Sequence, residues 1–314
     1  MVSRRLLRIK IFQILYAYFA NEGGEVVTFK KELDFSINKT HHLYFKFLLL
    51  LSEFKKIAET KIELGKNKNL PTLEDLNPNT KFINNKVITA LENSDKYNAY
   101  LNGYKVSWVI EDDFAKKLYK KMIASDYYEK YMNIEGDSNS DKKLIRNIFE
   151  ETILSCEEVA EYLEDDSIYW NDELEFVIDM IIKTIKSVNV ETESIEIIPL
   201  YKNSSDKQFT EDLFRKTIAN HDSNKELISK YVKNWDSDRL AVNDMIFMEM
   251  AVTELTQFND IPVRVTLNEY IELAKFYSTK QSGGFINGII DKIINDLKKS
   301  GEIKKVGMGL KGDV

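Results

Sequence analysis

The sequence predicts an all-α protein, and two features of its composition together with its apolar pattern lead to that fold class. The 314 residues include only 12 glycines and 4 prolines, whereas all-β folds spend both freely in their turns. Hydrophobic residues make up 43% of the chain, enough for a substantial core. Apolar residues also recur at helical spacing over most of its length. We therefore expect packed helices, in one large domain or two of ordinary size.

The N-terminal two thirds contain helices of uneven length. Residues 4–20 predict a helix that is apolar nearly all round, ended by Gly23 and Gly24. Residues 190–201 are rich in Val, Ile and Thr, which allows a short strand there. The further helices expected before that point cover residues 40–64, 82–91, 108–124, 144–163 and 174–188, with a loop at 66–86.

The C-terminal third has a more regular pattern. One helix is expected at 208–235, bent near 220–224, and the next is capped by residues 236–238 and runs to about 258. Pro262 precedes a helix at 263–277, since proline is tolerated where a helix starts. Residues 282–284 break the chain before a last helix at 285–297, which Gly301 ends, and a mobile tail follows.

Several functional classes are disfavoured. Cys156 is the single cysteine, which excludes a disulfide framework and a Cys-based zinc site and fits a reducing compartment. His41 and His42 are neighbours that point about 100° apart on a helix, so a metal site is not expected. The N-terminus superficially resembles a twin-arginine signal but lacks a small-x-small cleavage site, and no stretch approaches the roughly 20 apolar residues of a membrane span. We expect a cytoplasmic protein without membrane contact.

No catalytic motif is found. The chain has no phosphate-binding loop, dinucleotide fingerprint, zinc-protease motif or nucleophile elbow. Residues 150–175 carry eleven acidic and no basic residues, including Glu150-Glu151 and Glu157-Glu158. Such a stretch fits a solvated or partner-facing surface better than acid–base chemistry. We expect a protein that is not an enzyme, has no catalytic residue and needs no cofactor or metal.

The first helix concentrates positive charge in a chain of net charge −7. Arg4, Arg5 and Arg8 fall within about a 100° arc of that helix, and Gln13 and Tyr16 continue round from Arg5. Like charges four residues apart repel, and cations oppose the dipole at a helix N-terminus. An incoming anion would offset both costs, and arginine suits phosphate while Tyr16 offers a stacking face. RNA or another polyanion is therefore one interpretation, and a merely solvated basic helix start is the other.

Two C-terminal segments carry the most specific pattern, Ile261-Pro262-Val263 through Asn268-Glu269 to Ala274-Lys275, and Phe285-Ile286-Asn287-Gly288 through Asp291-Lys292. They resemble the signatures "iPvkVaiNEAvelAK" and "kFVNGvLdki" of the NusB family of transcription antitermination factors. Residues 235–240 through Glu254-Leu255 resemble the preceding family helix, and residues 4–16 resemble the opening "R-R-x-x-R…Q-x-LY". The resemblance covers residues 4–20 and about 208–298.

The resemblance implies an all-helical fold of two small bundles, here with a large, mainly helical insertion. It also implies binding to boxA-type RNA together with the small-subunit ribosomal protein NusE, within the transcription elongation complex. The implied RNA contacts lie on the first helix and before the last: Arg4, Arg5, Arg8, Gln13, Tyr16, Lys280, Gln281, Ser282 and Phe285. The NusE face would lie around Asp244.

The expected domain organisation follows from the same motifs. Residues 1–30 hold the first helix of the NusB-like core, 31–205 the partly acidic insertion, 206–300 the rest of the core and 301–314 the tail. Residues 40–64 could belong to either the core or the insertion. Two positions depart from the family: Glu249 stands where Arg is usual, and Gly284 replaces a common Lys.

Two other functions remain open. RNA cytosine methyltransferases carry a NusB-like N-terminal domain, but here the NusB-like motifs lie at the end of the sequence. A protein-interaction scaffold that works through the acidic insertion, with RNA contact reduced, is the second alternative.

Overall fold

The structure is a computed structural model that describes residues 2–21, 23–108, 112–134, 138–232 and 241–310. Its contacts divide the chain into two compact units. Residues 2–37 with 201–314 form one, here called the terminal unit, and residues 38–200 form the other, the middle unit. Within the described residues no helix is long and apolar enough to cross a membrane.

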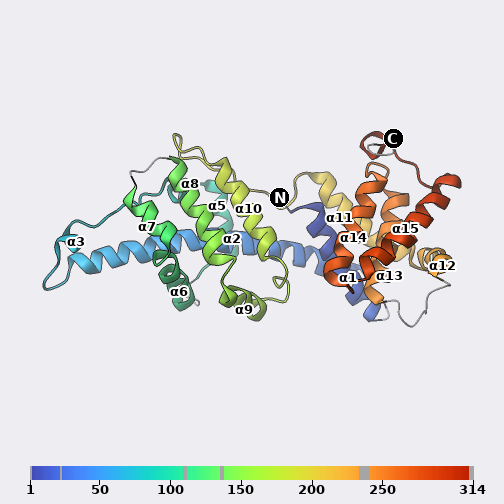
Figure 1. Cartoon of the computed structure of the whole chain (residues 1–314), viewed down its shortest axis with the longest axis horizontal. Coiled ribbons are helices and arrows are strands. Elements are labelled where there is room, and N and C mark those ends of the chain that lie inside the picture. The colour runs from blue at the N-terminus through green and yellow to red at the C-terminus, as the bar shows by residue number, and fades with distance from the viewer. Residues whose placement is uncertain (1, 22, 109–111, 135–137, 233–240, 311–314) are drawn as a thin grey trace. The chain divides into compact units, whose positions relative to one another are not determined.

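The terminal unit is built from helices that pack around one central helix (Figure 1). That helix, α13, is buried on nearly every side, and α1, α11, α12, α14 and α15 all pack against it. Phe12 of α1 stacks on Phe247 of α13 with ring centroids 4.3 Å apart, which fixes the first helix to this core. The helices are α1 (Arg4–Ala20), α11 (Ser204–Ala219), α12 (His221–Val232), α13 (Val242–Gln257), α14 (Val263–Tyr277) and α15 (Ser282–Lys299), with the first turns of α2 (Val26–Lys66).

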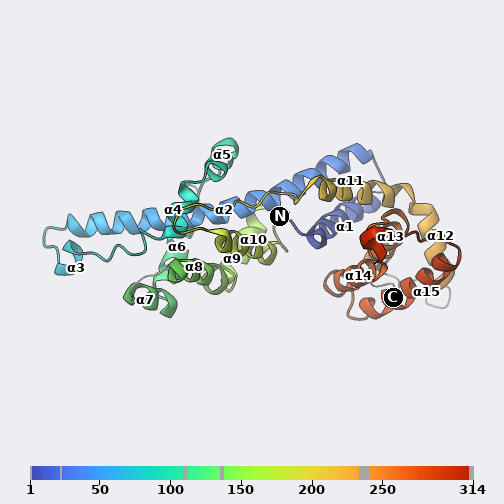
Figure 2. The ribbon, with the colours of Figure 1, turned by 90° about the horizontal axis from the view of Figure 1, so that it is seen from above.

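The middle unit is organised along the remainder of α2. Apolar side chains of α2 from Leu43 to Phe54 are buried, and Figure 2 shows α5 on one side of this helix and α6 to α9 on the other. The side chain of Lys46 lies inside a box of three aromatic rings, those of Trp108, Tyr162 and Trp170. The elements are α3 (Leu73–Leu76), α4 (Lys86–Glu92), α5 (Asp95–Tyr104), α6 (Asp112–Ile123), α7 (Asp126–Asn133), α8 (Ser138–Asn147), the π-helix η1 (Ile148–Ile153), α9 (Glu157–Asp166) and α10 (Leu174–Ser187).

The all-α prediction is confirmed, and two helices have the expected bounds. Helix α1 begins where Ser3 accepts a hydrogen bond from the backbone N–H of Leu6, which satisfies one of the free donors of the first turn. Helix α14 begins directly after Pro262. The possible strand at 190–201 is wrong: the described residues there form a single bridge between Asn189 and Ser194.

Other boundaries differ for local reasons. Helix α2 begins at Val26, well before the expected start at residue 40. The expected bent helix at 208–235 is two helices, α11 and α12, which meet at Asn220. Gly283 and Gly284 lie inside the first turn of α15 and do not break the chain before it. The expected cap at 236–238 falls outside the described residues.

Much of the segment predicted to be a mobile tail has defined contacts. The Val306 N–H donates to the carbonyl of Asn259 at 2.9 Å, and Lys305 Nζ donates to the carbonyl of Phe258 at 2.8 Å. The short 3-10 turn η3 (Gly307–Leu310) then brings Gly309 against the backbone of Asn259. Residues 311–314 of this segment lie outside the described residues.

A side chain at position 309 should therefore release this segment. A Cβ on Gly309 would lie 2.0 Å from the backbone oxygen of Asn259, so Gly309→Ala cannot keep the contact. We expect amide hydrogen exchange at Val306 to become at least about tenfold faster, because its hydrogen bond opens locally. Gly288→Ala is the matched control, since a Cβ there meets nothing within 4 Å. Unchanged exchange in Gly309→Ala would contradict the prediction.

Candidate nucleic-acid interface

Arg8 is the most deeply buried of the three arginines of α1. Its side chain is 3% exposed and makes two hydrogen bonds of 2.8 Å to the two carboxylate oxygens of Glu254 on α13. Thr266 and Tyr270 of α14 donate to the same carboxylate at 2.8 and 3.2 Å. Burial opposes the charge of Arg8, but the attraction and hydrogen bonds of Glu254 outweigh it and raise the pKa of Arg8. Arg8 therefore belongs to a buried network that joins three helices.

Arg4 and Arg5 lie nearer the surface and are also paired. Arg5 donates from Nε and Nη2 to the carboxylate of Glu269 at 3.0 and 2.9 Å, and its side chain is 42% exposed. Arg4 Nε donates to Asp206 at 2.9 Å, and its guanidinium lies 4.9 Å from the centre of the Phe209 ring. The hydrogen bonds that Arg5 donates to Glu269 are the main cause that raises the pKa of Arg5.

These ion pairs remove the electrostatic reason for expecting a bound anion at α1. An external anion is not needed to offset the repulsion among the arginines, because Asp206, Glu254 and Glu269 already do so within the protein. A buried arginine at position 8 is also not placed to touch RNA directly. The sequence shows the three arginines, but their carboxylate partners lie more than 200 residues away along the chain.

Side chains of α1 contact α14 at successive positions, in the same order along the two helices. Arg5 contacts Glu269, and seven residues further on Phe12 contacts Tyr277 with ring centroids 5.7 Å apart. The end of α14 therefore lies beside the second half of α1. Gln13 is half-buried and Tyr16 is 46% exposed there, so both remain accessible at this end of the helix.

The loop between α14 and α15 is anchored by hydrogen bonds through Ser282. Ser282 is buried, and its hydroxyl donates to Asp244 Oδ2 of α13 at 2.8 Å and accepts the backbone N–H of Thr279 at 3.1 Å. Lys280 and Gln281 are exposed between these two anchors, and Phe285 is half-buried one turn further on. The predicted site residues thus divide into an exposed set and a buried set. The exposed or half-buried ones are Arg4, Arg5, Gln13, Tyr16, Lys280, Gln281 and Phe285, and the buried ones are Arg8, Ser282 and Asp244.

The glycine at the close contact between α14 and α15 is not Gly288 of the Phe285-Ile286-Asn287-Gly288 segment. Gly288 is exposed, and a Cβ there would meet nothing within 4 Å. The close approach between α14 and α15 occurs instead at Gly283, where a Cβ would lie 3.2 Å from Cγ of Lys275.

A cavity of about 540 Å³ opens beside the arginines. Arg4, Arg5 and Arg8 line it from α1, Pro262 and Glu269 line it from the start of α14, and Met308 lines it from η3. The positive edge of the cavity is therefore bordered by carboxylates and by the C-terminal segment.

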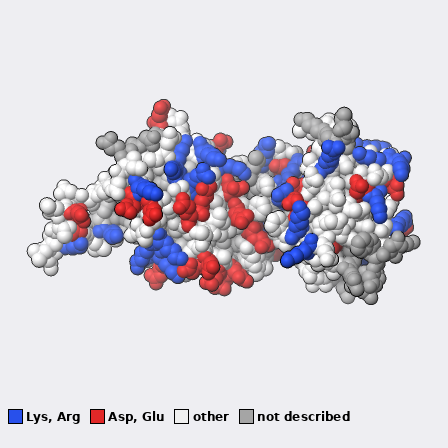
Figure 3. Space-filling view, viewed as in Figure 1, with Lys and Arg blue, Asp and Glu red and all other residues white. Residues whose placement is uncertain are grey.

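The acidic stretch of the middle unit lies against lysines. Figure 3 shows the carboxylates of α9 beside the basic side chains of α6. Lys121 Nζ contacts both Glu158 Oε2 at 2.6 Å and Cys156 Sγ at 3.2 Å, while Lys117 reaches Glu158 Oε1 at 3.1 Å. The Cys156 thiol and these lysines hold the pKa of Glu158 well below its usual range. Part of the acidic stretch is thus neutralised within its own unit.

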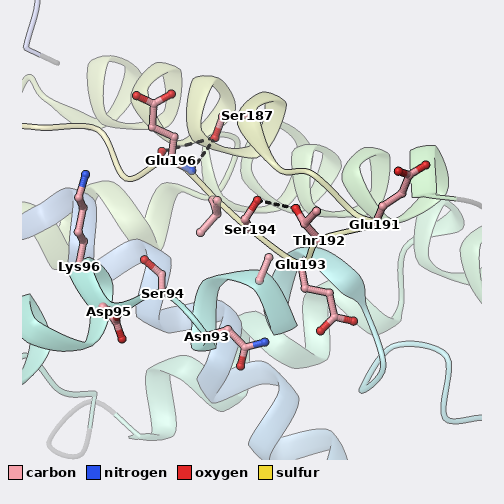
Figure 4. Close-up of a pocket in the computed structure, with 12 residues that line it drawn as sticks. Asn93, Ser94, Asp95, Lys96, Ser187, Glu191, Thr192, Glu193, Ser194 and Glu196 are labelled. Carbon is pink, nitrogen blue, oxygen red and sulfur yellow. Dashed lines mark hydrogen bonds between the residues drawn. The ribbon is translucent and has the colours of Figure 1, made fainter.

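The middle unit also has an open polar hollow of about 800 Å³ (Figure 4). The turn from Asn93 to Lys96 forms one side and residues 191–196 form the other. Several of its side chains bind one another: Thr192 and Ser194 share a hydrogen bond of 2.8 Å, and Ser187 accepts the N–H of Glu196. The hollow therefore presents polar groups that are already partly satisfied.

Comparison with known proteins shows the family to which the chain belongs. The NusB family model matches residues 174–295. A protein of Salinibacter ruber named transcription antitermination protein NusB is 43% identical over 115 residues, which cover 37% of this chain and 72% of the relative. The chain belongs to the NusB family. A relative of the same name from Natranaerobius thermophilus is 40% identical over 98 residues, which cover 31% of this chain and 70% of that protein.

The NusB match leaves much of this chain uncovered. A third NusB relative, from Chloroherpeton thalassium, is 38% identical over 104 residues, which cover 33% of this chain and 49% of that protein. No solved structure matches the chain. The NusB family model includes α10 and all of α11 to α14, and it ends within α15.

Proposed function

We propose that this protein is a transcription antitermination factor that acts by binding, not by catalysis. It binds boxA-type RNA together with the ribosomal protein NusE and joins the transcription elongation complex, where it modulates termination during rRNA synthesis. Membership of the NusB family supports the proposal, and the family model matches residues 174–295. The observation that supports a particular surface is the contact of Phe12, one turn before Tyr16 on α1, with Tyr277 at the end of α14, after which the loop with the exposed Lys280 and Gln281 begins.

The proposed RNA contacts are the accessible members of the predicted set. Arg5 and Lys280 supply cations for phosphates, Tyr16 supplies a stacking face, and Gln13 and Gln281 supply hydrogen bonds to bases or sugars. Arg4 and Phe285 border this surface. Arg8 and Ser282 are buried, and they support this surface by holding α1 and the loop in place.

Asp244, the residue predicted to lie on the NusE face, is also buried. Asp244 is 5% exposed and accepts the hydroxyl of Ser282, so its contribution is to position the loop and not to touch a partner. The exposed side chain nearest to it in sequence is Val242, which is 61% exposed at the start of α13. An apolar residue with that exposure fits the edge of a protein interface.

The scaffold alternative has one observation in its favour. All three arginines of α1 already bind carboxylates, so RNA phosphates would compete with Asp206 and Glu269 for them. A protein with weakened RNA contact would then depend on the middle unit for its partner. RNA affinity decides between the two functions.

Single substitutions on the proposed surface should weaken RNA binding in different ways. Lys280→Ala should lower affinity for a boxA-type RNA and reduce the slope of log affinity against log salt by about 1, because one phosphate contact is lost. Tyr16→Ala should lower affinity by about tenfold and leave the slope unchanged, because stacking is worth about 1–3 kcal/mol per base. Binding is measured by fluorescence anisotropy at several salt concentrations, with and without NusE.

Arg146→Ala is the charge-matched control for these variants. Arg146 is exposed in the middle unit and pairs with Glu150 one turn away. We expect its RNA affinity and salt slope to equal those of the unchanged protein. Equal affinities for all three variants would exclude the proposed surface, and no RNA binding by the unchanged protein in the presence of NusE would favour the scaffold.

A further inference from the structure

A second pocket in the terminal unit has a buried acidic floor. It measures about 640 Å³ and lies among α1, α11, α12 and α13, with Tyr18 and Phe19 from α1 and His221 from α12 on its walls. Glu249 of α13 lines it and is 0% exposed. Glu249 is one of the two positions at which the sequence departs from the NusB signatures.

The carboxylate of Glu249 is only half satisfied. Its Oε2 lies 2.8 Å from Nδ1 of His221, whose N–H donates to it. Its Oε1 is buried and has no hydrogen-bond partner among the described residues. Burial is the main cause that raises the pKa of Glu249, and the hydrogen bond from His221 opposes that rise. A buried carboxylate oxygen without a donor is costly, which points to a group that supplies one.

The local charge favours a cation as that group. Asp222 and Glu249 are acidic and Lys225 is the basic residue among the lining side chains, which leaves an excess of one negative charge when His221 is neutral. Aromatic walls from Tyr18 and Phe19 add faces that attract cations. The Phe19 ring stacks on His221 with centroids 4.5 Å apart, which holds the imidazole toward Glu249.

The geometry also selects the kind of cation. A guanidinium binds best through two parallel hydrogen bonds to both oxygens of a carboxylate, whereas only Oε1 of Glu249 lacks a partner. An ammonium group is a compact charge that can donate to Oε1 alone. Ile218, Val242 and Met245 line the rest of the pocket and suit an alkyl chain. We propose that this pocket binds a primary alkylammonium group, with Glu249 as its counter-ion.

The first test compares a charged ligand with a neutral one of the same length. n-Pentylammonium chloride and n-pentanol are titrated into the full chain, and amide chemical shifts are followed by NMR. We expect shifts centred on residues 18–23, 218–225 and 242–249, with the ammonium bound at least about tenfold more tightly, because hydrogen bonds between charged groups are the stronger ones. Absence of binding, or shifts centred elsewhere, would overturn the proposal.

Two variants test separately the charge of Glu249 and the free volume of the pocket. Glu249→Gln keeps the shape and an acceptor for His221, so it should abolish the preference for the ammonium over the alcohol. Val242→Trp adds a large side chain at the exposed edge of the pocket and leaves residue 249 a glutamate, so it should weaken the binding of both ligands. Glu226→Gln is the charge-matched control on the same helix α12, where Glu226 is 76% exposed, and should bind as the unchanged protein does. A preference retained in Glu249→Gln would refute the role of Glu249.

A third ligand distinguishes the two sources of such a group. Nα-acetyl-lysine N-methylamide carries the ammonium on a peptide backbone. Binding comparable to that of n-pentylammonium would identify a lysine side chain of a protein partner as the occupant. Binding of n-pentylammonium alone would identify a free alkylamine.

Discussion

Replacing Arg8 with methionine should destabilise the terminal unit by about 3–5 kcal/mol, the loss expected when one partner of a buried ion pair is removed. Methionine fills a similar volume but leaves the carboxylate of Glu254, which is 0% exposed, without its main counter-ion. Only the hydroxyls of Thr266 and Tyr270 would still donate to it, and burial beside Glu254 already raises the pKa of Tyr270 well above its ordinary value. The loss should therefore appear in α1, α13 and α14 together.

Amide hydrogen exchange in urea is the measurement, because a chain of two units need not unfold in one step. Amides of α13 and α14 should lose protection in Arg8→Met, and those of α8 and α10 serve as an internal reference. The double variant Arg8→Met/Glu254→Met should lose much less stability than the two single variants lose in sum, because no charge is left buried alone. Simple additivity of the two losses would show that the pair does not stabilise the unit.

Replacing Trp108 with alanine should destabilise the middle unit by about 3–5 kcal/mol. The indole is 2% exposed, and its Nε1–H donates to the carbonyl of Lys46 at 2.8 Å. Lys46 Nζ lies 5.0 Å from its ring centre, and this lysine is itself only 6% exposed. Alanine would leave both a cavity and a buried ammonium with one aromatic wall fewer.

Amide hydrogen exchange of α2 around Phe47 and Leu50 measures this loss of stability, and the α14 amides serve as a reference. Trp108→Phe should lose less stability than Trp108→Ala, since it keeps an aromatic wall but not the N–H donor. Tyr104→Ala, at a tyrosine that is 61% exposed, should change stability by no more than about 0.5 kcal/mol. A loss in Trp108→Ala as small as that of Tyr104→Ala would contradict the role given to the aromatic box.

The helices that were predicted best are those with many apolar residues and a clear start. Helix α1 has Ser3 as its cap and α14 has Pro262 before it, and both bounds follow from the sequence. Helices α5 and α7 are short and rich in tyrosine and polar residues, so no apolar stripe marks them. The first turns of α2 were missed because Lys30, Lys31 and Glu32 give them a polar pattern.

The candidate site was predictable only in part, and the reason is distance along the chain. The side chains proposed to contact RNA could be named from the sequence, because those of α1 and those of the loop at Lys280 each lie within one short segment. The partners that bury Arg8 and hold Arg5 come from α13 and α14, and no local pattern links them to α1. Glu249 was noticed as a departure from its family, but its unpartnered oxygen is visible only once α12 lies beside α13.

The bond between Arg8 and Glu254 spans 246 residues of sequence, and this has a consequence for how the chain is made. Synthesis at about 5–20 residues per second separates the emergence of the two partners by roughly 10–50 s. During that interval α1 presents Leu7, Ile11 and Leu15, which are fully buried in the finished unit, without the helices that cover them. The middle unit, residues 38–200, is synthesised before α13 and α14 and can fold first. We expect the nascent N-terminus to be a binding site for chaperones until α13 and α14 have left the ribosome.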